Sequence, residues 1–186
     1  MPDFKDSVAR VLDIEAGYSN DPVDRGGETI CGVARKFWPD WEGWLIVDRM
    51  KEKDIEPTVT PQLKALAEQL YRVHFWNRVH ADELENSEVA FEVFEIAVNA
   101  SVNKASLLLQ EALNLLNRNG KSWPELALDG AIGPRTVANV RVILRERNGA
   151  RSLVRAINAL QAEHYLRLAR KSPTQERFLR GWLERA

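Results

Sequence analysis

The sequence predicts a mainly α-helical protein with at most a minor β-hairpin near residues 28–34. Two observations support this fold class. Apolar residues recur at helical spacing along most of the chain, and no stretch shows sustained alternation of apolar and polar residues. Caps, prolines and glycines mark the ends of the periodic segments. Helices are therefore expected at about residues 4–16, 61–78, 88–99, 103–117, 134–147, 152–169 and 175–184.

The first two helices are identified by their apolar faces and start signals. Val8 and Val11 lie three residues apart on one face of the first helix. Thr60 followed by Pro61 is a strong start signal for the second helix, because proline is tolerated in the first turn, where its missing N–H would have no intrahelical partner. The charged, proline-flanked residues 39–61 are interpreted as a connecting segment between these helices.

The remaining helices follow one another closely to the end of the chain. Residues 88–99 and 103–117 each carry apolar residues three and four positions apart, and Pro134 begins the next helix. No internal repeat or low-complexity tract separates independently folding parts. We therefore expect two subdomains, residues 1–86 and 87–186, packed as one compact unit.

The composition is that of a soluble globular protein, with 45% hydrophobic and 28% charged residues. The formal charge of −1 provides no basic field for a nucleic-acid partner, and no run approaches the roughly 20 apolar residues of a membrane span. Cys31 is the only cysteine, so an internal disulfide is excluded and a buried structural thiol is expected. The first residues lack the basic and apolar regions of a signal peptide, which predicts synthesis in the cytoplasm.

Residues 15–32, EAGYSNDPVDRGGETICG, interrupt the helical pattern and begin with an acidic residue at a helix end. At about 100° per residue, Glu15 lies about 20° from Phe4 around the helix, so it falls inside the apolar stripe. Partial burial and the negative end of the helix dipole both disfavour the charged carboxylate and raise its pKa. Such a group is suited to act as a general acid near neutral pH. The alternative is a boundary residue whose charge reaches water.

The loop that follows Glu15 is rich in acids and in turn-forming residues. Its N-D-P and G-G turns predict a fixed loop that carries Asp21, Asp24 and Glu28 back towards the helix end. Cleavage of a glycosidic bond requires two carboxyl groups in different environments, one apolar and one solvated. The helix end and its loop therefore favour this chemistry.

Metal sites fit the sequence poorly. A calcium loop needs alternating oxygen ligands, but Pro22 and Arg25 interrupt the acids of the loop. The histidines, His74, His80 and His164, show no spacing typical of zinc ligands. We therefore expect neither a metal nor another cofactor.

The stretch EAGYSNDPVDRGGETICGV resembles the signature of the glycoside hydrolase family 108 lysozymes, usually E-G-G-Y-S-N-D-P-x-D-x-G-G-x-T-x-x-G-I-T. The resemblance continues through YRVHFWNRVHADEL, FEVFEIAVNASVNKASLLLQEALN and LDGAIGPRT to FLRGWLERA, so it covers nearly the whole chain. It implies a lysozyme-like helical fold and a peptidoglycan-binding region in the second half. Ala16, Ala34 and Glu95 replace a glycine, a threonine and an aspartate that are usual in the family.

The resemblance also implies roles for individual residues. Glu15 matches the catalytic acid of the family, and the more distant phage-type lysozymes have an aspartate and a threonine whose counterparts here are Asp24 and Thr29. The expected contacts to the sugar substrate are Tyr18, Asn20, Asp21, Trp41, Glu95 and Asn99. For the tryptophans, ordinary core packing is the alternative. By spacing alone, Glu92 and Glu95 are typical of a solvated helix face.

The family cleaves the glycan of bacterial cell walls and occurs in phage lysis genes and bacterial secretion loci. The resemblance therefore implies an N-acetylmuramidase that acts in the periplasm or on the wall after release through a holin or secretion machinery. Two alternatives remain open: a lytic transglycosylase that uses the same glutamate, and a non-catalytic wall-binding module. The stereochemistry is open too, because it depends on the distance between the two carboxyl groups.

Overall fold

A computed structural model describes residues 1–15, 17–20 and 27–186, and for residues 13–15 it describes the backbone alone. The described residues are mainly helical, with one small sheet, as predicted. They form two compact units. The N-terminal unit is Phe4–His74, and the C-terminal unit is Phe75–Ala186 together with Met1–Asp3. Within the described residues, no helix combines the length and apolar character needed to cross a membrane.

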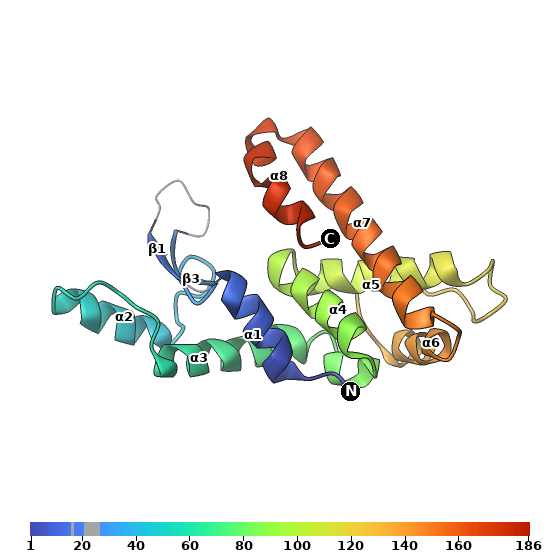
Figure 1. Ribbon diagram of the computed structural model, residues 1–186, viewed down its shortest axis with the longest axis horizontal. Helices are drawn as coiled ribbons and strands as arrows, with labels where there is room; N and C mark the ends of the chain where they lie inside the picture. The colour runs from blue at the N-terminus through green and yellow to red at the C-terminus, as the bar shows by residue number, and fades with distance from the viewer. Residues whose placement is uncertain (16, 21–26) are drawn as a thin grey trace. The chain divides into compact units, whose positions relative to one another are not determined.

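The N-terminal unit combines three α-helices with a three-stranded antiparallel sheet (Figure 1). Its elements are α1 (Phe4–Glu15), β1 (Tyr18–Asn20), β2 (Glu28–Ile30), β3 (Val33–Ala34), α2 (Gly43–Glu52) and α3 (Pro61–Tyr71). After α3 the chain continues as a π-helix, η1 (Arg72–Trp76), so the predicted helix at 61–78 is α-helical only to Tyr71. The start of α3 is as predicted, because the Thr60 side chain accepts a hydrogen bond from the Leu63 N–H.

The hairpin predicted near residues 28–34 is present as β2 and β3. Thr29 pairs with Ala34 and Ile30 with Val33, which leaves Cys31 and Gly32 as a two-residue turn. Both turn residues have positive φ, 52° and 69°, as a type I′ hairpin turn requires. Cys31 is buried, and its carbonyl accepts a hydrogen bond from the Tyr71 hydroxyl at 3.2 Å. The sheet is larger than predicted, since β1 adds a third strand beside β2.

The segment 39–61, interpreted from the sequence as a connection, contains a helix. Helix α2 buries Trp44 and Val47, which lie three residues apart on one face. The Arg35 guanidinium lies 4.4 Å from the centre of the Trp44 ring and covers it. This segment therefore contributes to the core of the N-terminal unit.

The C-terminal unit is a helical bundle with a 3-10 helix near its start. Its elements are η2 (Ala81–Leu84), α4 (Ser87–Asn99), α5 (Val102–Leu116), α6 (Pro134–Leu144), α7 (Gly149–Lys171), η3 (Pro173–Gln175) and α8 (Glu176–Leu183). Helices α4, α5 and α7 pack on one another, and α8 turns back along the end of α7 (Figure 1). Their shared core includes Phe94, Leu109, Leu113, Leu153 and Ile157.

The helix starts in the C-terminal unit follow ordinary capping chemistry. Asn86 accepts a hydrogen bond from the Val89 N–H before α4, and Ser101 accepts one from the Lys104 N–H before α5. Helix α7 begins at Gly149, three residues before the predicted start. A side chain at Gly149 would overlap the Ile143 carbonyl, so glycine lets the start of α7 lie against the end of α6.

Candidate functional site

Helix α1 carries the predicted catalytic acid at its last position. Val8, Val11 and Leu12 are buried on one face of the helix, each at most 3% exposed. Glu15 lies four residues after Val11, so helical spacing places its Cα at the next position along this face. The side chain of Glu15 lies outside the described residues, as do Asp21 and Asp24 entirely.

The sheet brings three of the predicted residues together. In the β1–β2 pairing, Ser19 lies opposite Thr29 and Asn20 lies opposite Glu28, and Tyr18 occupies the first position of β1. The Thr29 hydroxyl donates a hydrogen bond to the Gly27 carbonyl at 3.1 Å. Because its proton is used in this way, the Thr29 oxygen offers lone pairs to a second partner.

Glu28 connects the sheet to helix α2. Its carboxylate accepts a hydrogen bond from the Tyr18 hydroxyl at 3.0 Å and forms an ion pair with the Lys51 ammonium. The Arg35 Nε lies 2.7 Å from Glu28 Oε2, as an ion pair whose angle does not make a hydrogen bond. With these partners, Glu28 acts as a structural anchor for the hairpin, and is not available as a free acid.

Arg35 extends this anchor to a second carboxylate. Its two terminal nitrogens donate to both oxygens of Asp48, at 3.1 and 2.5 Å. The hydrogen bond from Arg35 lowers the pKa of Asp48, and the hydrogen bond to Glu28 raises the pKa of Lys51. We call Tyr18, Glu28, Arg35, Asp48 and Lys51 the Glu28 cluster. Burial, followed by the hydrogen bond to Glu28, raises the pKa of Tyr18, so its phenol stays protonated.

The Glu28 cluster was not found by reasoning from the sequence. Asp48 and Lys51 lie in residues 39–61, which were interpreted as a connecting segment. Arg35 lies just before that segment and was not predicted to have a role. One signal was available: Asp48 and Lys51 follow Trp44 and Val47 at helical spacing, so all four positions lie on one face of a helix. That pattern indicates a helix whose apolar face also carries two charged side chains.

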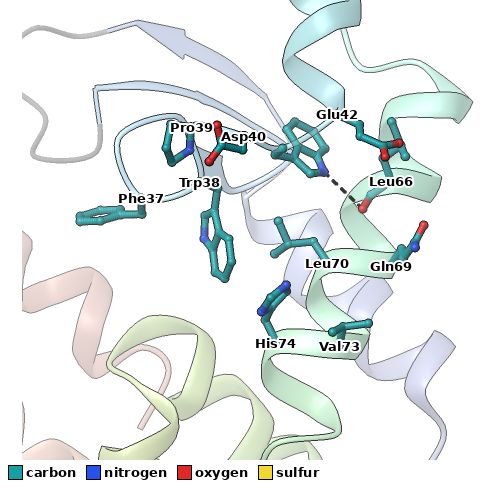
Figure 2. Close-up of a pocket in the computed structure, with 11 residues that line it drawn as sticks. Phe37, Trp38, Pro39, Asp40, Glu42, Leu66, Gln69, Leu70, Val73 and His74 are labelled. Atoms are coloured by element: carbon teal, nitrogen blue, oxygen red, sulfur yellow. Dashed lines mark hydrogen bonds between the residues drawn. The ribbon is translucent and has the colours of Figure 1, made fainter.

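A pocket of about 490 Å³ lies between the segment before α2 and helix α3 (Figure 2). Its lining includes Phe37, Trp38, Trp41, Leu66, Leu70 and His74. The Trp38 ring lies against the His74 imidazole, with centroids 4.5 Å apart (Figure 2). Trp41, a predicted sugar contact, is half-buried here, and its indole N–H donates to the Leu66 carbonyl at 3.4 Å. Trp44 and Trp76 are buried in the core instead.

Trp41 depends on a glycine for its position. A side chain at Gly43 would overlap the six-membered ring of Trp41. The indole therefore lies directly against the first turn of α2, with its edge towards the Trp44 ring at 5.3 Å between centroids. The pocket thus has an aromatic wall whose orientation is set by packing and by a hydrogen bond.

Glu95 and Asn99 belong to the C-terminal unit, where they are bonded to each other. The Asn99 amide donates to Glu95 Oε1 at 2.6 Å, and Gln161 from α7 donates to Glu95 Oε2 at 3.0 Å. Arg185 lies 4.0 Å from the Glu95 carboxylate and donates to the Asn99 oxygen. We call Glu95, Asn99, Gln161 and Arg185 the Glu95 network. The role of Glu95 and Asn99 in substrate binding stays a prediction.

The expectation of a solvated face at Glu92 and Glu95 is wrong. Glu92 is 9% exposed and Glu95 is 3% exposed. The physical reason is that α4 lies against both α5 and α7, so even the polar positions of α4 are covered. Among the described residues, no three His, Cys, Asp or Glu side chains gather closely enough to hold a metal ion.

Comparison with known proteins identifies the class. The family model described as Glycosyl hydrolase 108 matches residues 8–100, and the model described as Predicted Peptidoglycan domain matches residues 104–186. The chain belongs to the glycosyl hydrolase 108 family, and it is a glycoside hydrolase of the lysozyme type. Together, the hydrolase region and the peptidoglycan region define the chain as a peptidoglycan hydrolase, with bacterial cell-wall glycan as its substrate.

The fold is shared with a solved structure. The structure of Brucella abortus SagA aligns with a TM-score of 0.61 and 24% sequence identity, over 98% of this chain and 88% of that chain. At this identity the similarity extends to the fold alone. The comparison with curated proteins found no match.

Proposed function

We propose that the enzyme is an N-acetylmuramidase, which hydrolyses the β-1,4 bond between N-acetylmuramic acid and N-acetylglucosamine, with Glu15 as the general acid. One observation carries this proposal: Glu15 ends α1 at the position that continues the buried face of Val8, Val11 and Leu12. The Cα of Glu15 continues this apolar face at the helix end that carries the negative end of the dipole. Both surroundings favour the protonated form that a general acid needs.

The proposed reaction has two proton transfers, one to the bridging oxygen and one from the attacking water. Glu15 gives its proton to the bridging oxygen as the bond from that oxygen to the anomeric carbon breaks, and positive charge develops on the sugar ring. A water molecule then attacks the anomeric carbon, and Asp24 accepts its proton. Thr29 supports this step, because its hydroxyl proton is directed to the Gly27 carbonyl and its lone pairs can orient the water.

The remaining predicted contacts would bind the glycan. Aromatic rings cover the apolar faces of sugars, and in the N-terminal unit Tyr18 and the aromatic wall at Trp41 provide such rings. The proposed polar contacts are Asn20, Asp21, Glu95 and Asn99. Asn20 is exposed at the end of β1 and is therefore accessible to an acetamido group.

The test compares Glu15→Gln with wild type in the clearing of purified sacculi. The substitution keeps the shape and removes the proton donor, so the rate should fall at least about 10²-fold. The matched control is Glu52→Gln, because Glu52 also ends a helix of this unit but is exposed. We expect the control to keep the wild-type rate. A folded Glu15→Gln enzyme with near wild-type activity would exclude Glu15 as the acid.

The products decide between the alternatives. Mass spectrometry should find reducing N-acetylmuramic acid ends, which carry one added water per cleavage. Anhydro-muramic ends would instead show a lytic transglycosylase, in which the sugar's own hydroxyl replaces the water. If wild type releases no fragments from sacculi that it binds, the protein is a wall-binding module.

We further propose that the enzyme acts in the periplasm or on the wall after release through a holin-type pore or secretion machinery. The support is the location of its substrate, which lies outside the cytoplasmic membrane. Cytoplasmic expression should leave cells intact, and co-expression of a pore should cause lysis, followed as culture turbidity. Lysis without the pore and with an intact inner membrane would contradict this proposal.

A further inference from the structure

The C-terminal unit has a pocket of about 360 Å³, which shares Asn99 with the predicted site and has no part in the proposed proton transfers. It lies where the junction of α4 and α5 meets α7 and α8. Its lining is Asn99, Ala100, Ser101, Lys104, His164, Tyr165, Leu168 and Trp182. Five of these residues fall within the range 104–186 that matches the Predicted Peptidoglycan domain. We call it the Lys104 pocket.

One side of the Lys104 pocket is positively charged. Lys104 is half-buried, and among the residues that the structure describes no carboxylate forms an ion pair with its ammonium. The positive end of the α5 dipole lies at the same place, because Ser101 caps this helix and lines the pocket. An anion that entered here would meet a cation whose charge is not already neutralised.

The second titratable group of the pocket does not compete with Lys104 for an anion. Burial, and then the charges of Lys104 and Arg167, lower the pKa of His164, so its ring is neutral at neutral pH. Its Nδ1 is buried and has no hydrogen-bond partner among the described residues. Lys104 is therefore the charged group of the pocket lining, and His164 is a neutral polar neighbour.

Another part of the pocket lining is aromatic and is held in place. The Trp182 ring from α8 lies 5.3 Å from the Tyr165 ring, at an interplanar angle of 32°. Three residues after Trp182, Arg185 bonds to Asn99 and approaches Glu95, which ties the chain after α8 to the end of α4. The Glu95 network thus holds the chain next to Trp182 in place.

We propose that the Lys104 pocket binds a muropeptide, with Lys104 paired to a free carboxylate of the peptide stem and Trp182 against the adjoining sugar. The cationic and aromatic residues of the lining match the two parts of this ligand, an acidic peptide and a sugar ring with an apolar face. This inference rests on the proposed function only in that peptidoglycan is the substrate. It assigns one wall contact to the C-terminal unit.

The test uses two probes that differ in one charge. The first is muramyl dipeptide, N-acetylmuramoyl-L-alanyl-D-isoglutamine, and the second is the same compound with its free carboxyl group converted to an amide. Titration of the ¹⁵N-labelled full chain is followed at the Trp182 indole N–H signal, which is assigned from its loss in Trp182→Phe. We expect both probes to shift this signal, with the dissociation constant of the acidic probe about five- to tenfold lower.

Substitutions then locate the charge effect. Lys104→Met should remove the difference between the probes, and Lys104→Arg should keep most of it. The matched control is Lys121→Met, since Lys121 is an exposed lysine of the same unit and does not line the pocket. Equal affinities for the two probes in wild type, or a difference that survives Lys104→Met, would overturn the proposal, and the first outcome needs no variant to fold.

The outcome is independent of catalysis, because neither probe contains the β-1,4 bond. An enzyme that clears sacculi but binds both probes equally would refute the Lys104 pocket and leave the proposed function standing. An enzyme that discriminates between the probes through Lys104 but releases no fragments would refute the muramidase and leave the pocket standing.

Discussion

Glu28 in the N-terminal unit and Glu95 in the C-terminal unit are both carboxylates with several partners, but the partners differ in kind. Glu28 is held mainly by cations, Lys51 and Arg35, and its side chain is 11% exposed. Glu95 accepts hydrogen bonds from the amides of Asn99 and Gln161, and its side chain is 4% exposed, with Arg185 at 4.0 Å.

The difference shows how burial selects the partners of a charge. The cations of the Glu28 cluster are themselves partly exposed, 32% for Arg35 and 38% for Lys51, so they remain hydrated while they pair. In the core of the C-terminal unit, a full cation would have to lose its water as well, at a cost of several kcal/mol. Neutral amides satisfy the oxygens of Glu95 without that second desolvation.

Removal of the two carboxylates should therefore have unequal effects. Glu95→Ala leaves the buried amide of Gln161 short of an acceptor, and we expect the free energy of unfolding to fall by about 3 kcal/mol. Glu28→Ala leaves Arg35 paired with Asp48 and Lys51 free to reach water, so a loss of about 1 kcal/mol is expected. Denaturant unfolding at pH 7, followed by tryptophan fluorescence, measures both.

The same two variants can also refute the role given to burial. Equal losses, or a larger loss for Glu28→Ala, would show that the cationic partners of Glu28 carry more stability than their exposure suggests. In that case burial would not be the property that separates the two carboxylates.

A smaller effect concerns pH. It extends the comparison from the two carboxylates to a partly buried base, His164. The folded-state pKa of His164 is lowered by burial and by Lys104 and Arg167, from an unfolded value of about 6.5. Below that value the unfolded chain binds a proton that the folded chain does not. The stability that comes from this difference is complete above about pH 6.5 and is lost as the pH falls through the folded-state pKa.

His164→Gln removes this titration, so its stability should decline less than that of wild type between pH 7 and pH 5. Thermal melts at the two pH values measure the decline. His80→Gln is the matched control, because His80 is exposed and pairs with Glu83. An unchanged decline in His164→Gln would show that His164 reaches water in the folded protein.

Several parts of the fold were predictable because local chemistry decides them. The helices in the C-terminal unit follow from apolar spacing and from caps such as Asn86 and Ser101, which act within one turn of the chain. The β2–β3 hairpin follows from the Cys31-Gly32 pair in a two-residue turn. The place of Glu15 at the end of α1 follows from the same helical spacing.

Other parts of the candidate site could not be predicted, because they depend on contacts between distant residues. Strand β1 has three residues and forms only because β2 pairs with it. The hydrogen bond from Trp41 to the Leu66 carbonyl joins residues 25 positions apart. No periodicity within either segment indicates such a contact.

The sequence by itself determined the helical class of the fold, the start of α3 at Thr60 and the family signature that begins at Glu15. Each of these depends on residues within a few positions of one another. Only the tertiary structure decided that Glu95 is buried while Glu28 is anchored by Lys51, because helix packing determines which charges lose their water. Two acidic residues of the same type therefore have different surroundings, and spacing along the chain could not distinguish them.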